Sequence, residues 1–430
     1  MVRRGAPDRE HIAARLAELR ERTLALIGTL SESELRRQPC DALGPLLWDV
    51  GHMAHFEELW CIRALGAPRV AAPHGFTHAQ LDHLYDASQQ PREHRERLAL
   101  PNREQSLAYL ERVRVDTLAA LSKWRAAPEK LSANGFIWRL MAGHEAQHQE
   151  TLLQSLEALG LSWSLPGLRT QAPLGTPVPD LARASVPGGR YPIGSTTHAP
   201  YDNERPAFAI QLEAFEIDRY PVSNRRYADF INEGGYARKE LWSAEGWAWR
   251  ESEQIELPLY WDRVGSALRV RRRGGYQELK LSEPVQHVSH HEAEAFARWS
   301  GARLPTEFEW ETAASFDPAT GERCADRRHR QVRLQSGPSE LGQSGTAPSA
   351  FGLHDLHGSV YQWTSSPFQG YEGFRAFPYA QYSRVFFGRR YRVLRGSSWA
   401  AACELRRDAY RNWDLPRRRQ MFCGLRLAWS

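Results

Sequence analysis

The sequence predicts an α+β protein with more than one domain, in which a bundle of four helices is followed by a loop-rich domain of short strands. Three observations lead to this prediction. A chain of 430 residues is longer than one hydrophobic core usually serves. Its composition, with 42% hydrophobic and 25% charged residues, is that of a globular protein. Helical periodicity prevails up to about residue 165, whereas short apolar runs between glycine turns prevail from Val186 onward.

The first part of the chain contains four stretches with apolar residues at helical spacing. They are His11–Leu30, Pro45–Leu65, Arg103–Trp124 and Ala133–Leu159. Four such helices imply a bundle, and we expect it to span residues 8–164. Proline and glycine are frequent in the next segment, so residues 165–185 are expected to form an interdomain linker.

Residues 186–430 form the expected second domain. Short apolar runs, glycine turns and many aromatic residues predict strands there, with one helix at His291–Ser300. The stretch Phe316–Pro348 is polar and rich in glycine and arginine, and we expect it to be an exposed excursion.

Charge and cysteine content exclude several classes of function. The net charge of +5 is small for this length and no long Lys/Arg block is present, so nucleic acid is not an expected partner. No apolar run is long enough for a membrane span, and the first residues do not resemble a secretory signal. A cytoplasmic location is therefore expected. The five cysteines are scattered, which indicates neither a disulfide framework nor a structural zinc site.

A metal-binding motif lies in the last predicted helix of the bundle. His144 and His148 are four residues apart, so their imidazoles share one helix face and can bind a single metal ion. With Glu145 they also spell His-Glu-x-x-His, the zinc-protease signature in which the glutamate is a general base. The motif alone leaves both the metal and the reaction open.

A third ligand can come from the second predicted helix. His52 and His55 stand there among apolar residues that suit a bundle core, where a lone histidine is most often a packed core residue. Beside the later pair, however, three histidines on two helices form a reasonable ligand set for an open metal site. At roughly 100° per residue the two candidates lie only about 60° apart around the helix, so geometry does not choose between them.

Several longer motifs in the second part of the chain resemble a known domain. They are Val186–Ser195, Asp202–Pro206, Pro284–Ser289, Ala302–Glu311 and Arg392–Ala400. Together they resemble the formylglycine-generating-enzyme-like (sulfatase-modifying-factor) domain, which has a C-type-lectin-like fold. A four-helix domain of the DinB type joined to this domain resembles the nonheme iron sulfoxide synthases of ergothioneine biosynthesis, with the related selenoneine synthases. The resemblance covers nearly the whole chain.

This resemblance implies a set of site residues. The pattern Trp-Asp-x-x-His matches Trp48, Asp49 and His52, so the resemblance implies that His52, His144 and His148 bind iron(II). It implies a catalytic role for Tyr379 and substrate-binding roles for Gln147, Tyr382, Trp413, Asp414, Arg92 and Arg95. Taken singly, the aromatics are typical of core packing and the polar residues of surface or capping positions. Their recurrence in order beside three histidines favours the functional interpretation.

The resemblance also implies the reaction, which is oxidative C–S or C–Se bond formation on the imidazole of hercynine with iron(II) and O2. Three neutral imidazoles leave about three iron positions open, and zinc could not donate an electron to dioxygen. The donor is a thiol such as γ-glutamylcysteine or a selenosugar, and departures from the family pattern at Val360–Trp363 and Gly396–Trp399 leave that choice open. Two other classes stay possible: a zinc-dependent hydrolase that uses His-Glu-x-x-His, and a non-catalytic lectin-like binding module.

Overall fold

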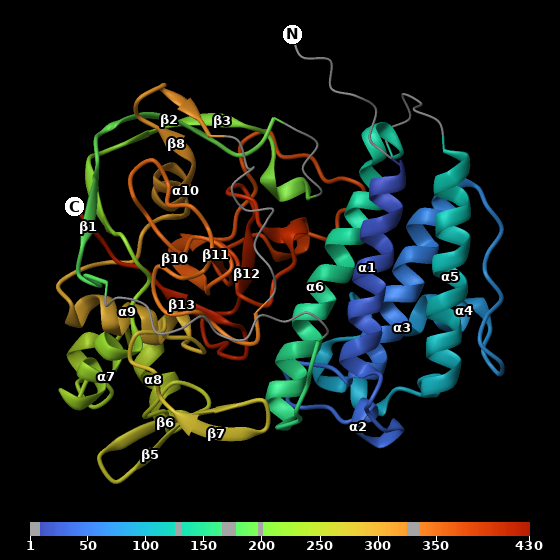
Figure 1. Cartoon of the computed structure of the whole chain (residues 1–430), viewed down its shortest axis with the longest axis horizontal. Helices are drawn as coiled ribbons and strands as arrows, with labels where there is room; N and C mark the ends of the chain where they lie inside the picture. Colours follow the sequence, from blue (N-terminus) through green and yellow to red (C-terminus); the bar gives the residue numbers. More distant parts are fainter. Residues whose placement is uncertain (1–8, 125–130, 166–177, 197–200, 325–334) are drawn as a thin grey trace. The chain divides into compact units, whose positions relative to one another are not determined.

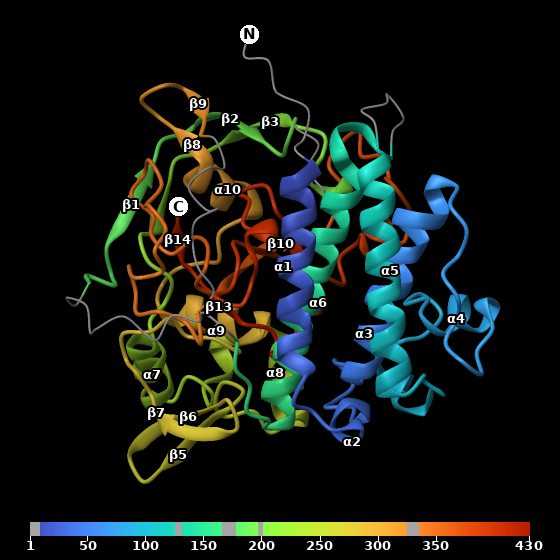
Figure 2. The same cartoon turned by 45° about the vertical axis from the view of Figure 1, so that its right-hand side comes forward.

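The computed structural model describes residues 9–124, 131–165, 178–196, 201–324 and 335–430. The chain divides into two compact units, Met1–Pro166 and Gly167–Ser430. The first unit is helical and the second combines small sheets with short helices, which confirms the predicted α+β class (Figures 1 and 2). Among the described residues, no helix is both long and apolar enough to cross a membrane.

Four long helices build the first unit, and each matches a predicted stretch. They are α1 (Arg9–Ile27), α3 (Leu46–Glu57), α5 (Arg103–Lys123) and α6 (Phe136–Leu159). Helix α1 packs along α6 and α3 packs along α5, as both cartoon views show. Shorter elements complete the unit: α2 (Glu32–Arg36), η1 (Glu58–Ile62), η2 (Arg63–Leu65), α4 (His78–Leu84), η3 (Arg92–Arg97) and η4 (Ala133–Gly135).

The ends of these helices follow from local chemistry. Asn102 starts α5 with a capping box, because its side chain accepts from the Gln105 amide while the Gln105 side chain accepts from the Asn102 amide. Helix α6 stops at Gly160, whose φ of 68° is left-handed and therefore suits glycine.

The middle of the first unit contains a cluster of buried charges, one from each long helix. Arg20 on α1 binds Glu57 on α3 (2.8 Å) and Glu145 on α6 (2.9 Å). Arg114 on α5 binds the same two carboxylates, at 2.7 Å and 2.6 Å. All four side chains are less than a tenth exposed. Two positive and two negative charges thus balance where water cannot solvate them, and we call this group the buried ion-pair cluster.

Two sheets organise the second unit. The larger has the order β12-β11-β10-β13, and the other has the order β1-β4-β14. Their strands are β10 (Tyr361–Pro367), β11 (Arg392–Arg395), β12 (Asn412–Asp414), β13 (Cys423–Leu425), β1 (Arg183–Val186), β4 (Phe215–Asp218) and β14 (Ala428–Trp429). Only β10 and β13 pair in parallel; the other pairs in these two sheets are antiparallel.

Small antiparallel ribbons surround these sheets. They are β2 (Gly189–Ile193) with β3 (Phe208–Leu212), β5 (Trp261–Val264) with β6 (Ala267–Arg272) and β7 (Gly275–Glu278), and β8 (Phe316–Asp317) with β9 (Glu322–Arg323). Strand β1 begins at Arg183, inside the range expected to be linker, because it pairs with β4 in register Arg183↔Asp218.

The second unit contains more helix than the sequence indicates. The predicted helix is present as α9 (His290–Trp299), but the described part also contains α7 (Asn224–Asn232), α8 (Ala244–Ser252) and α10 (Glu307–Ser315). Each of the three has nine residues, too few for a clear helical period. They begin instead at side-chain caps, which are Ser223, Ser243 and Thr306.

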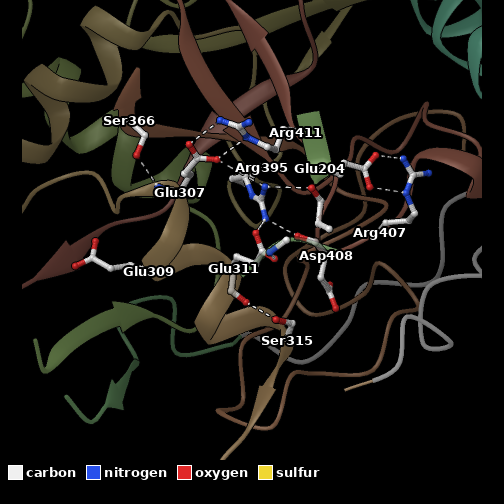
Figure 3. A network of polar contacts seen from close by, with 12 residues as sticks. Glu204, Glu307, Glu309, Glu311, Ser315, Ser366, Arg395, Arg407, Asp408 and Arg411 are labelled. Carbon is white, nitrogen blue, oxygen red and sulfur yellow. Dashed lines mark hydrogen bonds and ion pairs between the residues drawn. The ribbon is translucent and has the colours of Figure 1, made fainter. Parts of the chain in front are cut away.

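Buried arginine–glutamate pairs hold the loops of the second unit (Figure 3). Arg395 on β11 binds Glu311 on α10 at 2.5 Å, and Arg411 makes two hydrogen bonds to Glu307, at 2.7 Å and 2.9 Å. Figure 3 also shows Arg407 paired with Glu204. These charge-assisted bonds connect segments that the sheets alone would leave unattached.

The expectation of an exposed excursion at Phe316–Pro348 is wrong for part of its described residues. Leu341 is only 3% exposed, and the carboxylate of Asp355 accepts hydrogen bonds from the backbone amides of Gly342 and Ser344. Backbone hydrogen bonds of this kind are invisible in composition, which is why the polar sequence suggested exposure. All five cysteines are free, in agreement with the expectation of no disulfide framework.

We predict that Arg114→Met lowers the free energy of unfolding by about 3–5 kcal/mol, because Glu57 and Glu145 would keep their charges but lose one of two cationic partners. The measurement is urea denaturation of the full chain followed by far-UV circular dichroism. Arg112→Met is the matched control, since Arg112 is exposed on the same helix and should change stability by less than about 0.5 kcal/mol. Equal effects of the two variants would contradict a structural role for the cluster.

Candidate functional site

Three histidines of the first unit converge. His52 comes from α3, and His144 and His148 come from successive turns of α6; one ligand nitrogen of each lies within 4.8 Å of the others. The ring centroids are 5.2 Å apart for His52 and His144, 4.9 Å for His52 and His148, and 4.5 Å for the α6 pair. Metal–nitrogen bonds are about 2 Å long, so small side-chain rotations bring these nitrogens to a common ion.

Hydrogen bonds orient two of these imidazoles. Nδ1 of His52 lies 2.8 Å from the carbonyl oxygen of Tyr85, and Nδ1 of His148 lies 3.0 Å from Oδ1 of Asp49. Both partners can only accept, so each Nδ1 carries a hydrogen, and in the neutral ring Nε2 keeps its lone pair for a metal. Outer partners of this kind set the tautomer and ring direction in metal sites.

The end of α4 supplies the carbonyls that hold the α3 side chains. Leu84 accepts from the indole nitrogen of Trp48 at 3.0 Å, and the next carbonyl, that of Tyr85, accepts from His52. Carbonyls at a helix end lack intrahelical partners and are available for such bonds. Gly51 leaves room for the Tyr85 side chain, since a Cβ there would lie 2.0 Å from the Tyr85 hydroxyl oxygen.

Aromatic rings and burial complete the surroundings of the three histidines. Trp48 stacks on His52 at 4.6 Å, and Phe56 stacks on His144 at 3.9 Å. Burial, followed by the charge of His148, lowers the pKa of both His52 and His144 well below the ordinary value. The two imidazoles are therefore neutral at pH 7, which is the form that binds metal.

His55, the alternative third ligand, belongs to a different environment. Its Nε2 lies 3.4 Å from Oδ1 of Asp82, which is also bound by Arg63 and Arg69. Burial lowers the pKa of His55 to about 4, although Asp82 and Glu58 oppose that shift. The structure thus brings His52, and not His55, to the α6 pair.

Glu145 is not placed as a metalloprotease base. Its carboxylate belongs to the buried ion-pair cluster and also accepts from the hydroxyl of Thr23 at 2.8 Å. Burial favours the protonated acid, but Arg20 and Arg114 outweigh it and hold the pKa of Glu145 at about 2. A general base must reach the reacting water near the metal. This carboxylate is instead bound by Arg20, Arg114 and Thr23.

The three polar candidates of the first unit differ in position. Gln147 is half-buried on α6, one residue before His148. The guanidinium carbon of Arg95 lies 3.3 Å above the ring of Trp48, and burial, then the charge of Arg92, lowers the pKa of Arg95 to about 9. Arg92 is exposed and donates to the carbonyl of Ala42 at 3.2 Å.

In the second unit, three of the predicted residues meet in one aromatic group. Tyr382 lies 6.2 Å from Tyr379 and 5.7 Å from Trp413, in edge-on geometry for both pairs. Tyr201 stacks on Tyr382 at 4.6 Å, and Phe368 stacks on Trp413 at 4.1 Å. We call the group of Tyr379, Tyr382 and Trp413 the aromatic triad. The electron-rich faces of aromatic rings are the usual partners of a quaternary ammonium group.

Asp202 in η5 (Asp202–Glu204) fixes the segment that carries both tyrosines. Its carboxylate accepts from the hydroxyl of Ser383 at 2.5 Å and from the amide of Phe377 at 3.2 Å. Burial raises the pKa of Tyr379 above the ordinary tyrosine value, and the charge of Asp202 adds to the shift. The Tyr379 hydroxyl is therefore protonated at neutral pH.

Asp414 follows Trp413 at the end of β12 and already has protein partners. It accepts from the amide of Leu415 at 2.7 Å and from the side chain of Gln420 at 3.1 Å. Arg418, which sequence reasoning did not single out, has its Nε 4.0 Å from Oδ1 of Asp414. The spacing of four residues between these opposite charges is the sequence pattern that could have indicated the pair.

Three other contributors were also not assigned a role from the sequence. Asp49 stands in the Trp-Asp-x-x-His motif, so its spacing from His52 was the signal for it. Tyr85 acts through a backbone carbonyl, which no side-chain pattern reveals. Asp202 lies far along the chain from Ser383, and only the folded chain brings them together.

Comparisons with known proteins agree with the architecture. Residues 15–152 match the DinB superfamily, and residues 175–430 match the sulfatase-modifying factor enzyme 1-like domain. A formylglycine-generating enzyme of Thermomonospora curvata is 33% identical over 42% of this chain and 69% of its own.

Two whole-length relatives carry the name hercynine oxygenase. The one from Mycolicibacterium thermoresistibile is 40% identical over 99% of this chain and 96% of its own. The one from Mycolicibacterium smegmatis is 40% identical over 98% of this chain and 99% of its own. Identity of this degree along both domains confirms the resemblance, and the chain belongs to the hercynine oxygenase family of ergothioneine sulfoxide synthases.

Proposed function

We propose that this chain catalyses iron(II)- and O2-dependent formation of a C–S or C–Se bond on the imidazole ring of hercynine. The convergence of His52, His144 and His148, with lone pairs oriented by Tyr85 and Asp49, supports the proposal most directly. The whole-length relatives named hercynine oxygenase support the choice of substrate.

The three imidazoles would hold iron(II) and leave positions open beside it. When bound, iron(II) supplies the electrons that dioxygen needs, which zinc cannot do. A zinc hydrolase is the weaker assignment, because Glu145 is tied to Arg20 and Arg114 and cannot act as its base. The ordered tautomers of His52 and His148 would also be an unexplained feature in a metal-free binding module.

The remaining residues would bind and orient the substrates. Gln147 and Tyr382 hold the imidazole of hercynine, and the indole of Trp413 faces the trimethylammonium group, which cannot make ordinary hydrogen bonds. Tyr379 keeps its proton at neutral pH and donates it during bond formation. Asp414 contacts an amine or hydroxyl of the donor substrate.

Two arginines would distinguish the donors. A peptide thiol such as γ-glutamylcysteine carries carboxylates, for which Arg92 and Arg95 are suitable partners, whereas a selenosugar offers mainly hydroxyl groups. The guanidinium of Arg95 is preorganised over Trp48, whose ring stacks on His52. An ordered guanidinium loses little entropy when a carboxylate binds, and this supports a role for Arg95 with a peptide thiol.

We predict that His52→Ala abolishes stoichiometric iron binding, whereas His55→Ala retains it, because only His52 shares a common point with the α6 histidines. The measurement is iron content by mass spectrometry after anaerobic loading and gel filtration. His55→Ala is the matched control from the same helix. Iron retained in His52→Ala, or lost equally in both variants, would contradict the proposed ligand set.

We predict that Tyr379→Phe keeps iron and hercynine binding but lowers the yield of coupled product by about 100-fold or more, the scale of a lost proton donor. Oxidation of the donor alone should take its place. Products are measured by mass spectrometry after incubation of hercynine and donor in air. Tyr276→Phe, at an exposed position on β7, is the control and should behave like the parent. A normal coupling yield in Tyr379→Phe would remove this tyrosine from the mechanism.

We predict that Arg92→Ala and Arg95→Ala each weaken binding of a peptide thiol by roughly 1.5–3 kcal/mol, the value of a hydrogen bond to a charged group. Hercynine binding should not change. Calorimetric titration of the iron-loaded chain with each substrate measures both effects, and Arg97→Ala, at an exposed position nearby, is the control. If both variants bind the thiol like the parent while a selenosugar is turned over, the donor is the selenosugar.

A further inference from the structure

A second group of histidines lies in the second unit, at the start of α9. His290 and His291 are its first two residues and Glu294 is on the following turn; one ligand atom of each lies within 4.8 Å of the others. The imidazoles are 2% and 5% exposed, and the Glu294 side chain is 31% exposed. The proposed reaction uses none of these residues.

The contacts of His290 leave two hydrogen-bond acceptors facing each other. Its Nε2 lies 3.1 Å from the carbonyl oxygen of Thr364 on β10, so Nε2 carries the hydrogen. In a neutral ring, Nδ1 is then a lone pair, and it lies 3.7 Å from Oε2 of Glu294. Two acceptors at this separation repel unless a cation or a proton lies between them.

His291 supplies a third possible metal-ligand atom. Its Nδ1 is buried and makes no hydrogen bond to any described residue. Gly246 on α8 packs closely against the ring, since a Cβ there would lie 3.2 Å from this nitrogen. Leaving a buried polar atom unsatisfied costs about 1–3 kcal/mol, and coordination of a metal ion would remove that cost.

Charges on the neighbouring elements restrict the type of ion that this group can bind. Burial, followed by the charge of Arg392, lowers the pKa of His290, and burial also lowers the pKa of His291, so both rings are neutral at pH 7. Burial raises the pKa of Glu294, against the charges of Arg298 and Arg392. The charges of Arg298 and Arg392 repel a bound cation, whereas only Glu294 and the exposed Glu245 attract it. Electrostatic attraction alone therefore does not account for cation binding at this group. Imidazole coordination, which suits Zn²⁺ and not Ca²⁺ or Mg²⁺, is needed.

We propose that His290, His291 and Glu294 bind a divalent transition-metal ion, with Zn²⁺ as the first candidate, at a site separate from the His52, His144 and His148 group. Two imidazoles and one carboxylate form a known ligand set for zinc, with a fourth position for water. Zinc–nitrogen bonds are about 2.0–2.1 Å long, so the side chains need only small rotations. The ion would join the first turn of α9 to a side chain one turn later and satisfy both buried nitrogens.

The test uses the full chain with His52→Ala, His144→Ala and His148→Ala combined, so that any remaining metal belongs to the second unit. After dialysis against a chelator, calorimetric titration with Zn²⁺ should give one equivalent, and Co²⁺ should give visible bands of a nitrogen-ligated site. Adding Glu294→Gln or His291→Asn should remove that equivalent. In the parent chain loaded with iron, the same equivalent of zinc should appear in addition to iron.

The control is Glu245→Gln, which removes a negative charge near the group without removing a proposed ligand. It should keep the equivalent of zinc. Each zinc-free variant should retain the far-UV spectrum of the parent, and zinc should raise the melting temperature only where Glu294 and His291 are both present. Failure of the intact group to bind Zn²⁺, or equal loss in Glu245→Gln, overturns the proposal, and a proton shared by His290 and Glu294 then explains their contact.

Discussion

Charges buried in the helical unit must be balanced, and Arg20, Glu57, Arg114 and Glu145 satisfy this requirement by meeting from four different helices. Each guanidinium contacts both carboxylates, so a rotation or slide of any helix would leave a charge without its partner. Such a loss costs more than the pair contributes, and the cluster therefore specifies helix orientation more than it adds stability. His144 precedes Glu145 on α6, so the orientation that buries the carboxylate sets the direction of the imidazole.

The tautomer of each histidine must also be fixed, because an imidazole can present either nitrogen to a metal. The Tyr85 carbonyl and the Asp49 carboxylate remove this freedom for His52 and His148 by accepting from Nδ1. Burial then keeps the rings of His52 and His144 neutral. Gly51 contributes to this packing, because its missing side chain leaves room for the Tyr85 ring against α3. The packing of Tyr85 against α3 thus helps to determine which nitrogen of His52 can bind a metal.

The second unit is stabilised differently, because its long loops lie outside the hydrogen-bonded helices and sheets. Buried arginine–glutamate pairs attach the loops to α10 and β11, as Figure 3 shows, and Asp202 attaches the segment that carries Tyr379. A rigid loop can hold aromatic rings at fixed angles, which a flexible one cannot. The aromatic triad is the result, and the proposed reaction would use its electron-rich faces for the cationic substrate.

The sequence by itself determined the two-part architecture, the four long helices and the pairing of His144 with His148, because helical period and four-residue spacing are local properties. Tertiary structure decided the rest. The family resemblance already implied His52, but helix geometry did not separate it from His55, which lies only about 60° away around the same helix. Packing against α4 and Asp82 separates the two side chains. The role of Glu145, the short capped helices and the burial near Leu341 depend on partners distant in sequence. Local patterns carry no information about such partners, since the contacts exist only after the chain has folded.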